Sequence, residues 1–157
     1  MITIKTEIIV DFLPTLVDMY NALVNLETFN KLNGHRNTSD VRTARFQIGR
    51  ATSHSHSACR LQHYLSKKGL NCILVSPTDK SKDDLKLMYN QAVGPLPANT
   101  IIYSGKDFSG DMITWNGRKV PDVVIFDQAS LYIDAYYNAG GFFGNRLDTN
   151  CKFILIQ

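Results

Sequence analysis

The sequence lacks the features of a secreted or membrane-spanning protein. Its three cysteines are an odd set with no framework spacing, so no disulfide scaffold is predicted. The longest apolar runs, residues 123–126 and 153–156, are far too short to span a bilayer. Residues 1–7 show no charged-then-apolar signal pattern. These absences predict a reducing, cytoplasmic location and no membrane partner.

A strong excess of one charge is also absent. Lys and Arg together number 17 and Asp and Glu 14, which gives a net charge of +3, and no dense basic cluster dominates any segment. That balance is compatible with a nucleic-acid partner without indicating one. With 157 residues, 44% of them hydrophobic and 20% charged, the chain is expected to form one globular domain with a substantial core.

The spacing of apolar residues predicts helices that alternate with short buried strands. A long amphipathic helix is expected over residues 12–32, because apolar side chains recur there at three- and four-residue steps and Asn33-Gly34 ends the pattern. Strands are expected within 2–10 and at 42–48, 71–76, 100–103, 123–126 and 152–156, and further helices at 54–68, 80–91 and 129–138. An Asn-Gly turn predicts a β-hairpin over 112–120.

This order of elements predicts an α/β fold, namely a three-layer α/β/α domain with a mostly parallel sheet plus the hairpin. The whole chain, 1–157, is expected to be a single domain, with an N-terminal strand and helix in 1–40 and the core in 41–157. The helix of 12–32 is expected to be core or to cover a sheet edge. A partner or dimer interface would show the same pattern.

Two segments suit a nucleotide site. Residues 45–56 read RFQIGRATSHSH, which predicts a strand, a turn and the start of a helix, and a helix N-terminus favours bound phosphate. Residues 122–128 read DVVIFDQ, a buried strand that ends in a carboxylate suited to magnesium. A phosphate loop and a magnesium-binding acid are the two parts that a P-loop site requires.

In these motifs the chain resembles the P-loop NTPase superfamily, and within it the ATPase core of phage large terminase-like proteins. Family members often carry Ser/Gly-Arg-x-x-Gly-Lys-Thr/Ser, a frame that residues 49–55 fit, and the order of elements agrees over about 42–157. The resemblance implies an ATP and magnesium site with Asp127 and Ser55 as magnesium ligands, Arg50 as a source of positive charge and Gln128 at the position of the catalytic Glu. The implied nucleotide-binding residues are Gly49, Arg50, Thr52, Ser53, His54, Ser55 and His56.

Both motifs depart from the family pattern. Ser53 replaces the glycine that lets the loop wrap phosphates, and His54 replaces a lysine whose charge-assisted contact is worth about 1.5–3 kcal/mol. Histidine imitates lysine only when protonated, near or below a pKa of about 6.5. Gln128 replaces a water-activating carboxylate, a loss of about 10²–10⁴-fold in rate. The departures predict a site that binds rather than catalyses.

Other interpretations of the same residues stay open. Residues 42–57 also fit a plain connection from strand to helix, with Asp127 as an ordinary polar strand end. His56, Cys59 and His63 fall at spacings of three and four, which would align them on one helix face as ligands for zinc or another transition metal. Packing of Cys59 against the sheet is favoured over that set, because no second Cys/His group is evident to complete it.

The sequence therefore predicts a degenerate P-loop NTPase-like protein (a pseudo-ATPase) of phage or mobile-element origin. It is expected to bind a macromolecular partner rather than to be an enzyme. A protein is the first expected partner and nucleic acid the second, with self-association left open. The alternatives are a nucleotide-binding switch or slow ATPase that works with nucleic acid, and a metal-dependent His/Cys enzyme.

Overall fold

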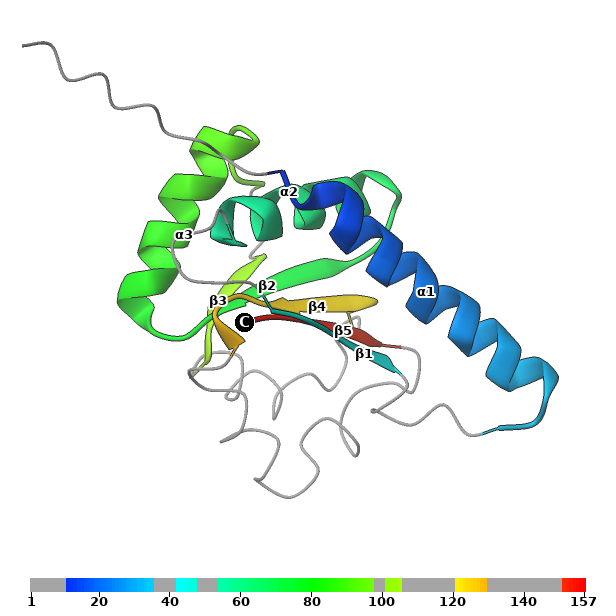
Figure 1. Cartoon of the computed structure of the whole chain (residues 1–157). Helices are drawn as coiled ribbons and strands as arrows, with labels where there is room; N and C mark the ends of the chain where they lie inside the picture. The colour runs from blue at the N-terminus through cyan, green and yellow to red at the C-terminus, as the bar shows by residue number, and fades with distance from the viewer. Residues whose placement is uncertain (1–10, 36–41, 48–53, 98–100, 106–120, 130–150) are drawn as a thin grey trace, which may run out of the picture.

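The computed structural model describes residues 11–35, 42–47, 54–97, 101–105, 121–129 and 151–157 (Figure 1). Along these residues helices and strands alternate up to β3, after which two further strands follow. The elements are α1 (Leu13–Leu32), β1 (Thr43–Phe46), α2 (His54–Lys67), β2 (Cys72–Ser76), α3 (Asp79–Ala92), β3 (Ile102–Ser104), β4 (Val123–Phe126) and β5 (Lys152–Ile156). Three predicted elements lie outside the described residues: the strand within 2–10, the hairpin over 112–120 and, apart from Ala129, the helix over 129–138.

The strands form one sheet in the order β1-β5-β4-β2-β3, and every adjacent pair is parallel. The predicted α/β class with a parallel sheet is thereby confirmed. Every residue of β2, β4 and β5 is buried. Both faces of the sheet centre are therefore covered, as the expected three-layer arrangement requires, and this explains why these strands are apolar throughout rather than alternating.

The three described helices lie on the same side of the sheet in Figure 1, with α2 between α1 and α3. Alternate strand residues such as Leu74 and Ile125 pack against Leu61 and Leu65 of α2 in the main apolar cluster. The sequence supplies this contact because α2 has apolar side chains one turn apart on its inner face. The packing fixes α2 over the sheet centre. Among the described residues, no helix combines the length and hydropathy needed to cross a bilayer.

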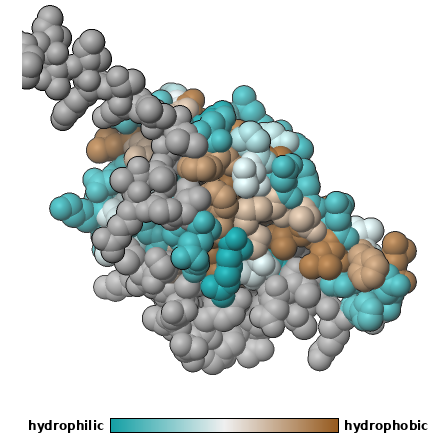
Figure 2. All heavy atoms as spheres, viewed as in Figure 1, coloured by the Kyte–Doolittle hydropathy of each residue, from teal (hydrophilic) through white to brown (hydrophobic). Residues whose placement is uncertain are grey.

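α1 differs from the amphipathic helix that the sequence predicts. Its inner residues Leu16 and Leu23 are buried, but Leu26, Phe29 and Leu32 are 37%, 56% and 82% exposed. In Figure 1 α1 extends past the edge of the sheet, and Figure 2 shows hydrophobic atoms continuing along that side of the molecule. The far end of α1 therefore has apolar side chains without a sheet beneath them.

α3 begins with a capping box. Thr78 Oγ1 accepts a hydrogen bond from the Ser81 backbone N–H at 3.1 Å, and Ser81 Oγ accepts one from the Thr78 N–H at 2.9 Å. These two bonds satisfy N–H groups that have no partner inside the helix.

Replacing Thr78 by alanine is expected to lower the free energy of unfolding by about 1 kcal/mol, because the first turn of α3 loses its cap. Urea denaturation followed by circular dichroism measures the change. Lys80→Ala, an exposed substitution in the same turn, is the control and is expected to have little effect. Equal midpoints for wild type and Thr78→Ala would show that the cap contributes nothing.

An ion pair fixes α1 to the start of β5. Lys152 Nζ lies 2.5 Å from Glu27 Oε2, and Lys31 Nζ lies 3.1 Å from Glu27 Oε1. The side chains of Lys152 and Glu27 are both largely buried, whereas that of Lys31 is exposed. Burial alone would raise the pKa of Glu27, but the hydrogen bonds from Lys152 and Lys31 hold that pKa below its usual value.

Lys152→Ala is expected to destabilise the fold by an amount near the lower end of the about 3–5 kcal/mol typical of broken buried pairs, since Lys31 still neutralises Glu27. The folded-state pKa of Glu27 is lowered, so its contribution is complete above the unfolded-state pKa and is lost as the pH falls through the folded-state pKa. Thermal unfolding between pH 7 and pH 3 tests both statements. Lys31→Ala is the matched control, and a loss as large as that of Lys152→Ala would contradict the assignment.

Candidate functional site

The candidate site lies where the carboxyl end of β4 meets the N-terminus of α2. Asp127 directly follows β4, and its backbone N–H bonds the carbonyl oxygen of Val75 in β2 at 2.9 Å. Ser55 stands in the first turn of α2, and its hydroxyl donates a hydrogen bond to Asp127 Oδ2 at 2.6 Å. Two residues 72 positions apart in the sequence are thus in direct contact.

The order of the strands explains how this contact arises. β5 lies between β1 and β4, so the strand before the predicted loop and the strand before Asp127 are separated by two strand spacings, about 9–10 Å. Residues 48–53, which connect β1 to α2, lie outside the described residues. α2 begins beside β4 and presents Ser55 to the carboxylate. Both groups therefore lie at the carboxyl edge of the sheet, where open α/β sheets usually bind ligands.

Asp127 is a deeply buried carboxylate, with 1% of its surface exposed. Burial raises the pKa of Asp127 to about 6, and the hydrogen bonds from the Ser55 hydroxyl and the Gln128 backbone N–H oppose that rise. The carboxylate is charged at neutral pH and protonates within two pH units below it. A buried acid of this kind destabilises the folded state and is characteristic of functional sites.

His54, the residue at the position of the P-loop lysine, is the first residue of α2 and is half-buried. Desolvation by the surrounding protein lowers the pKa of His54 below its usual value. Because that value is already about 6.5, the imidazole is neutral at pH 7 and does not supply the charge of a lysine. The other predicted loop residues, Gly49, Arg50, Thr52 and Ser53, lie outside the described residues.

The two positions of α2 that follow Ser55 offer further polar atoms. His56 Nδ1 and Ser57 Oγ are buried and have no hydrogen-bond partner among the described residues. The sequence analysis assigned a role to His56 and none to Ser57. Ser57 lies beyond the P-loop-like motif, which ends at Ser55. It is one of three buried serines at this edge, with Ser76 and Ser104, for which the sequence predicted no role.

Ser76 and Ser104 are the last residues of β2 and β3, and both are buried. Ser76 donates a hydrogen bond to Ser81 Oγ at 2.9 Å. β2 is the neighbour of β4 in the sheet, so Ser76 lies at the same edge as Asp127. The signal for Ser76 in the sequence was a serine at the end of an apolar run. Its significance depends on the strand order, which the sequence does not show.

Gln128 takes the place of the catalytic Glu in the resemblance and has an unusual backbone. Its φ of 50° lies in the left-handed region that residues other than glycine rarely adopt. The side chain is exposed, next to the buried Asp127. Strain of this kind costs on the order of 1–3 kcal/mol and is concentrated at functional sites. An amide at this position cannot accept the proton of a water molecule as a carboxylate does.

The alternative metal set of His56, Cys59 and His63 is not assembled as ligands. No group of three or more His, Cys, Asp or Glu residues in the described part of the chain could hold a metal ion. Cys59 is fully buried, and its Sγ faces the Leu85 carbonyl oxygen of α3 at 4.0 Å. Burial and the charge of Asp127 raise the pKa of the Cys59 thiol to about 12, as is usual for a thiol packed in an apolar core.

His63, in contrast, lies on the outer side of α2, where it lines a surface cavity with Arg60 and Lys67. The preference for Cys59 as a packed core residue therefore agrees with its position in the α2–α3 contact.

Comparisons with protein-family models and with curated proteins find no match for this chain.

Among the described residues, the site brings together two oxygen groups, the Ser55 hydroxyl and the Asp127 carboxylate. A hydroxyl and a carboxylate in contact are the oxygen ligands that P-loop proteins use for magnesium. The neutral imidazole of His54 and the amide of Gln128 stand where a phosphate-binding cation and a base would be needed.

Proposed function

We propose that this protein is a degenerate P-loop NTPase-like domain that acts by binding a macromolecular partner, a protein in the first place, without hydrolysing nucleotide. The observation that carries the proposal is the contact between Ser55 and Asp127 at the carboxyl edge of a parallel sheet, in combination with His54 and Gln128. Ser55 and Asp127 are the magnesium-binding groups that an inherited nucleotide site would retain. His54 and Gln128 replace the lysine and the glutamate that such a site needs for hydrolysis.

The energetic argument supports binding without catalysis. Loss of the lysine removes about 1.5–3 kcal/mol of phosphate binding, and His54 is uncharged at neutral pH and does not replace it. Loss of the base removes about 10²–10⁴-fold in rate. We infer that a domain with this fold and without these groups acts by binding a partner through its surface. Phage or mobile-element origin follows from the terminase-like resemblance alone and is part of the same proposal.

A nucleotide-binding switch is the second candidate, and the Ser55–Asp127 pair favours it. The hydroxyl and the carboxylate need only a small separation to admit a hydrated magnesium ion between them. In this candidate ATP and magnesium are ligands whose binding alters the contact of α2 with β4.

The deciding experiment measures ATP hydrolysis and magnesium-dependent ATP binding at pH 7.5 for the wild type and for Asp127→Ala. The proposed function predicts no phosphate release above that of Asp127→Ala and no calorimetric heat with ATP below millimolar concentration. Micromolar binding that disappears in Asp127→Ala, without turnover, would favour the switch. Turnover that depends on Asp127 would overturn the non-catalytic proposal.

A further inference from the structure

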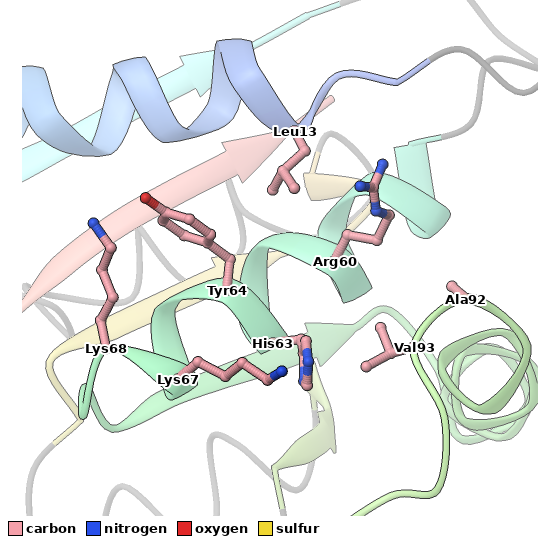
Figure 3. A pocket seen from close by; sticks show the side chains of 8 residues that line it. All are labelled: Leu13, Arg60, His63, Tyr64, Lys67, Lys68, Ala92 and Val93. Atoms are coloured by element: carbon pink, nitrogen blue, oxygen red, sulfur yellow. The ribbon is translucent and has the colours of Figure 1, made fainter.

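A cavity of about 430 Å³ lies on the outer side of α2, away from the sheet (Figure 3). Three helical segments form it: the start of α1, the outer side of α2, and the end of α3 with the residue that follows it. Its volume is within the range of sites that bind small molecules or single side chains. Its lining residues are Leu13, Arg60, His63, Tyr64, Lys67, Lys68, Ala92 and Val93.

The cavity has a positively charged wall. Its cations are Arg60 and Lys67 of α2 and Lys68, which directly follows α2. His63, between Arg60 and Lys67 in the sequence, lines the same wall. Arg60 is neutralised in part by Asp11, whose carboxylate is 2.6 Å from the guanidinium. Lys67 and Lys68 form no ion pair with any described residue, although Lys68 Nζ lies 4.7 Å from the centre of the Tyr64 ring. Among the described residues, therefore, no acid pairs with these two cations.

The opposite part of the cavity is apolar. Leu13 enters from α1, and Ala92 and Val93 lie across from α2 at the end of α3. The ring of Tyr64 lies between Leu13 and Lys68 in Figure 3. An occupant that matches the whole surface must combine an aliphatic or aromatic side chain with at least one negative charge within a few ångströms.

We propose that this cavity is the docking site for an acidic, partly apolar peptide segment of a protein partner. A Leu, Ile or Phe side chain of the segment packs against Leu13 and Val93, and neighbouring Asp or Glu side chains pair with Lys67 on one side and Lys68 on the other. The proposal rests on the proposed function, because it names the partner surface that a non-catalytic domain needs. Charge complementarity carries it, since the unmatched cations border an apolar surface.

The lining favours a peptide over single-stranded nucleic acid. Nucleic-acid surfaces use several exposed aromatic faces, on which successive bases stack, along an extended basic groove. Here the cavity has two aromatic rings, the phenol of Tyr64, which already has Lys68 over it, and the imidazole of His63, and its apolar residues are aliphatic. Aliphatic contacts bind an apolar side chain well and do not provide a stacking surface.

Selection from a random dodecapeptide phage library on the immobilised protein tests the proposal. The enriched peptides are expected to contain Asp or Glu within four residues of Leu, Ile, Phe or Trp. The best of these, synthesised with a fluorophore, is expected to bind Lys67→Glu/Lys68→Glu at least tenfold more weakly by fluorescence anisotropy, and to bind the wild type more weakly as salt rises. Val93→Ser tests the apolar part and is expected to weaken binding as well.

Lys80→Glu/Lys86→Glu is the matched control, because it makes the same charge change on α3 outside the cavity. Its affinity for the peptide is expected to stay within twofold of wild type. Failure to enrich any sequence, enrichment of sequences without acids, or equal losses in the control would overturn the proposal. So would tighter binding of a (dT)₁₅ oligonucleotide that depends on Lys67 and Lys68. These outcomes do not involve Asp127, so they are distinguishable from a failure of the non-catalytic proposal in the hydrolysis assay.

Discussion

Asp127→Asn is expected to make the protein more stable at pH 7.5 while it removes any magnesium-dependent binding of nucleotide. The carboxylate is 1% exposed, and burial raises its pKa to about 6 against a usual 3.8. The folded state must therefore hold a buried charge that the unfolded state keeps in water. An asparagine of nearly the same shape removes that charge, and its amide oxygen still accepts the hydrogen bond from Ser55.

The size and pH range of the effect follow from linkage. The folded state holds its proton up to about pH 6 and the unfolded state only up to about pH 4, so wild-type stability falls as the pH rises through this interval. The difference amounts to about 3 kcal/mol at neutral pH, or roughly 6–12 °C in Tm for a domain of this size. The Asp127→Asn variant does not lose stability in this way. It is therefore expected to be more stable than the wild type above pH 6 and equally stable below pH 4.

Thermal unfolding in EDTA at pH 4 and pH 7.5 measures the prediction. Asp122→Asn is the control, because Asp122 flanks the other end of β4 and is less buried. A lower Tm for Asp127→Asn at pH 7.5 would show that favourable contacts outweigh the desolvation of the carboxylate. A stabilised variant with lost function is the usual result when a buried charge is retained for binding.

Restoring the missing groups is expected to give the protein a working nucleotide site. Ser53→Gly, His54→Lys and Gln128→Glu together rebuild the family pattern around the existing Ser55–Asp127 pair. The lysine is expected to tighten magnesium-ATP binding by about 10–150-fold, the equivalent of about 1.5–3 kcal/mol. The glutamate is expected to raise turnover by about 10²–10⁴-fold over the variant that keeps Gln128.

Calorimetry and phosphate release measure the two parts of this prediction separately. The same triple variant with Asp127→Ala is the control and is expected to lose both properties. Absence of nucleotide binding in the triple variant, with an unchanged Tm, would mean that the segment before α2 does not form a phosphate loop. The plain strand-to-helix connection would then be the correct interpretation.

The sequence predicted the elements of the fold well because the evidence for them is local. Apolar runs in the segments of β2, β4 and β5 follow from burial on both faces, and this pattern is visible without any knowledge of neighbours. The end of α2 was predicted for a similar reason, since Gly69 adopts a φ of 85° that other residues disfavour. The exposed apolar side chains at the far end of α1 were not predicted, because helical spacing does not show how far the sheet extends.

The candidate site was predictable in part. The types of residue at Ser55 and Asp127 were evident from the motifs, and so were the departures at His54 and Gln128. The contact of 2.6 Å between the first two was not, because it depends on where α2 begins relative to β4. The strained backbone of Gln128 also gave no sequence signal, since glutamine has no preference for a positive φ.

The sequence by itself determined the α/β class, the helices and strands, and the chemistry available at the two motifs, because each of these depends on residues close together in the chain. Only the tertiary structure decided that β5 lies between β1 and β4, that Asp127 is buried with a raised pKa, and that three helical segments line a surface cavity with two lysines that pair with no described acid. Strand order, burial and cavities are set by contacts between segments far apart in sequence. Periodicity carries no information about those contacts, and packing alone fixes them.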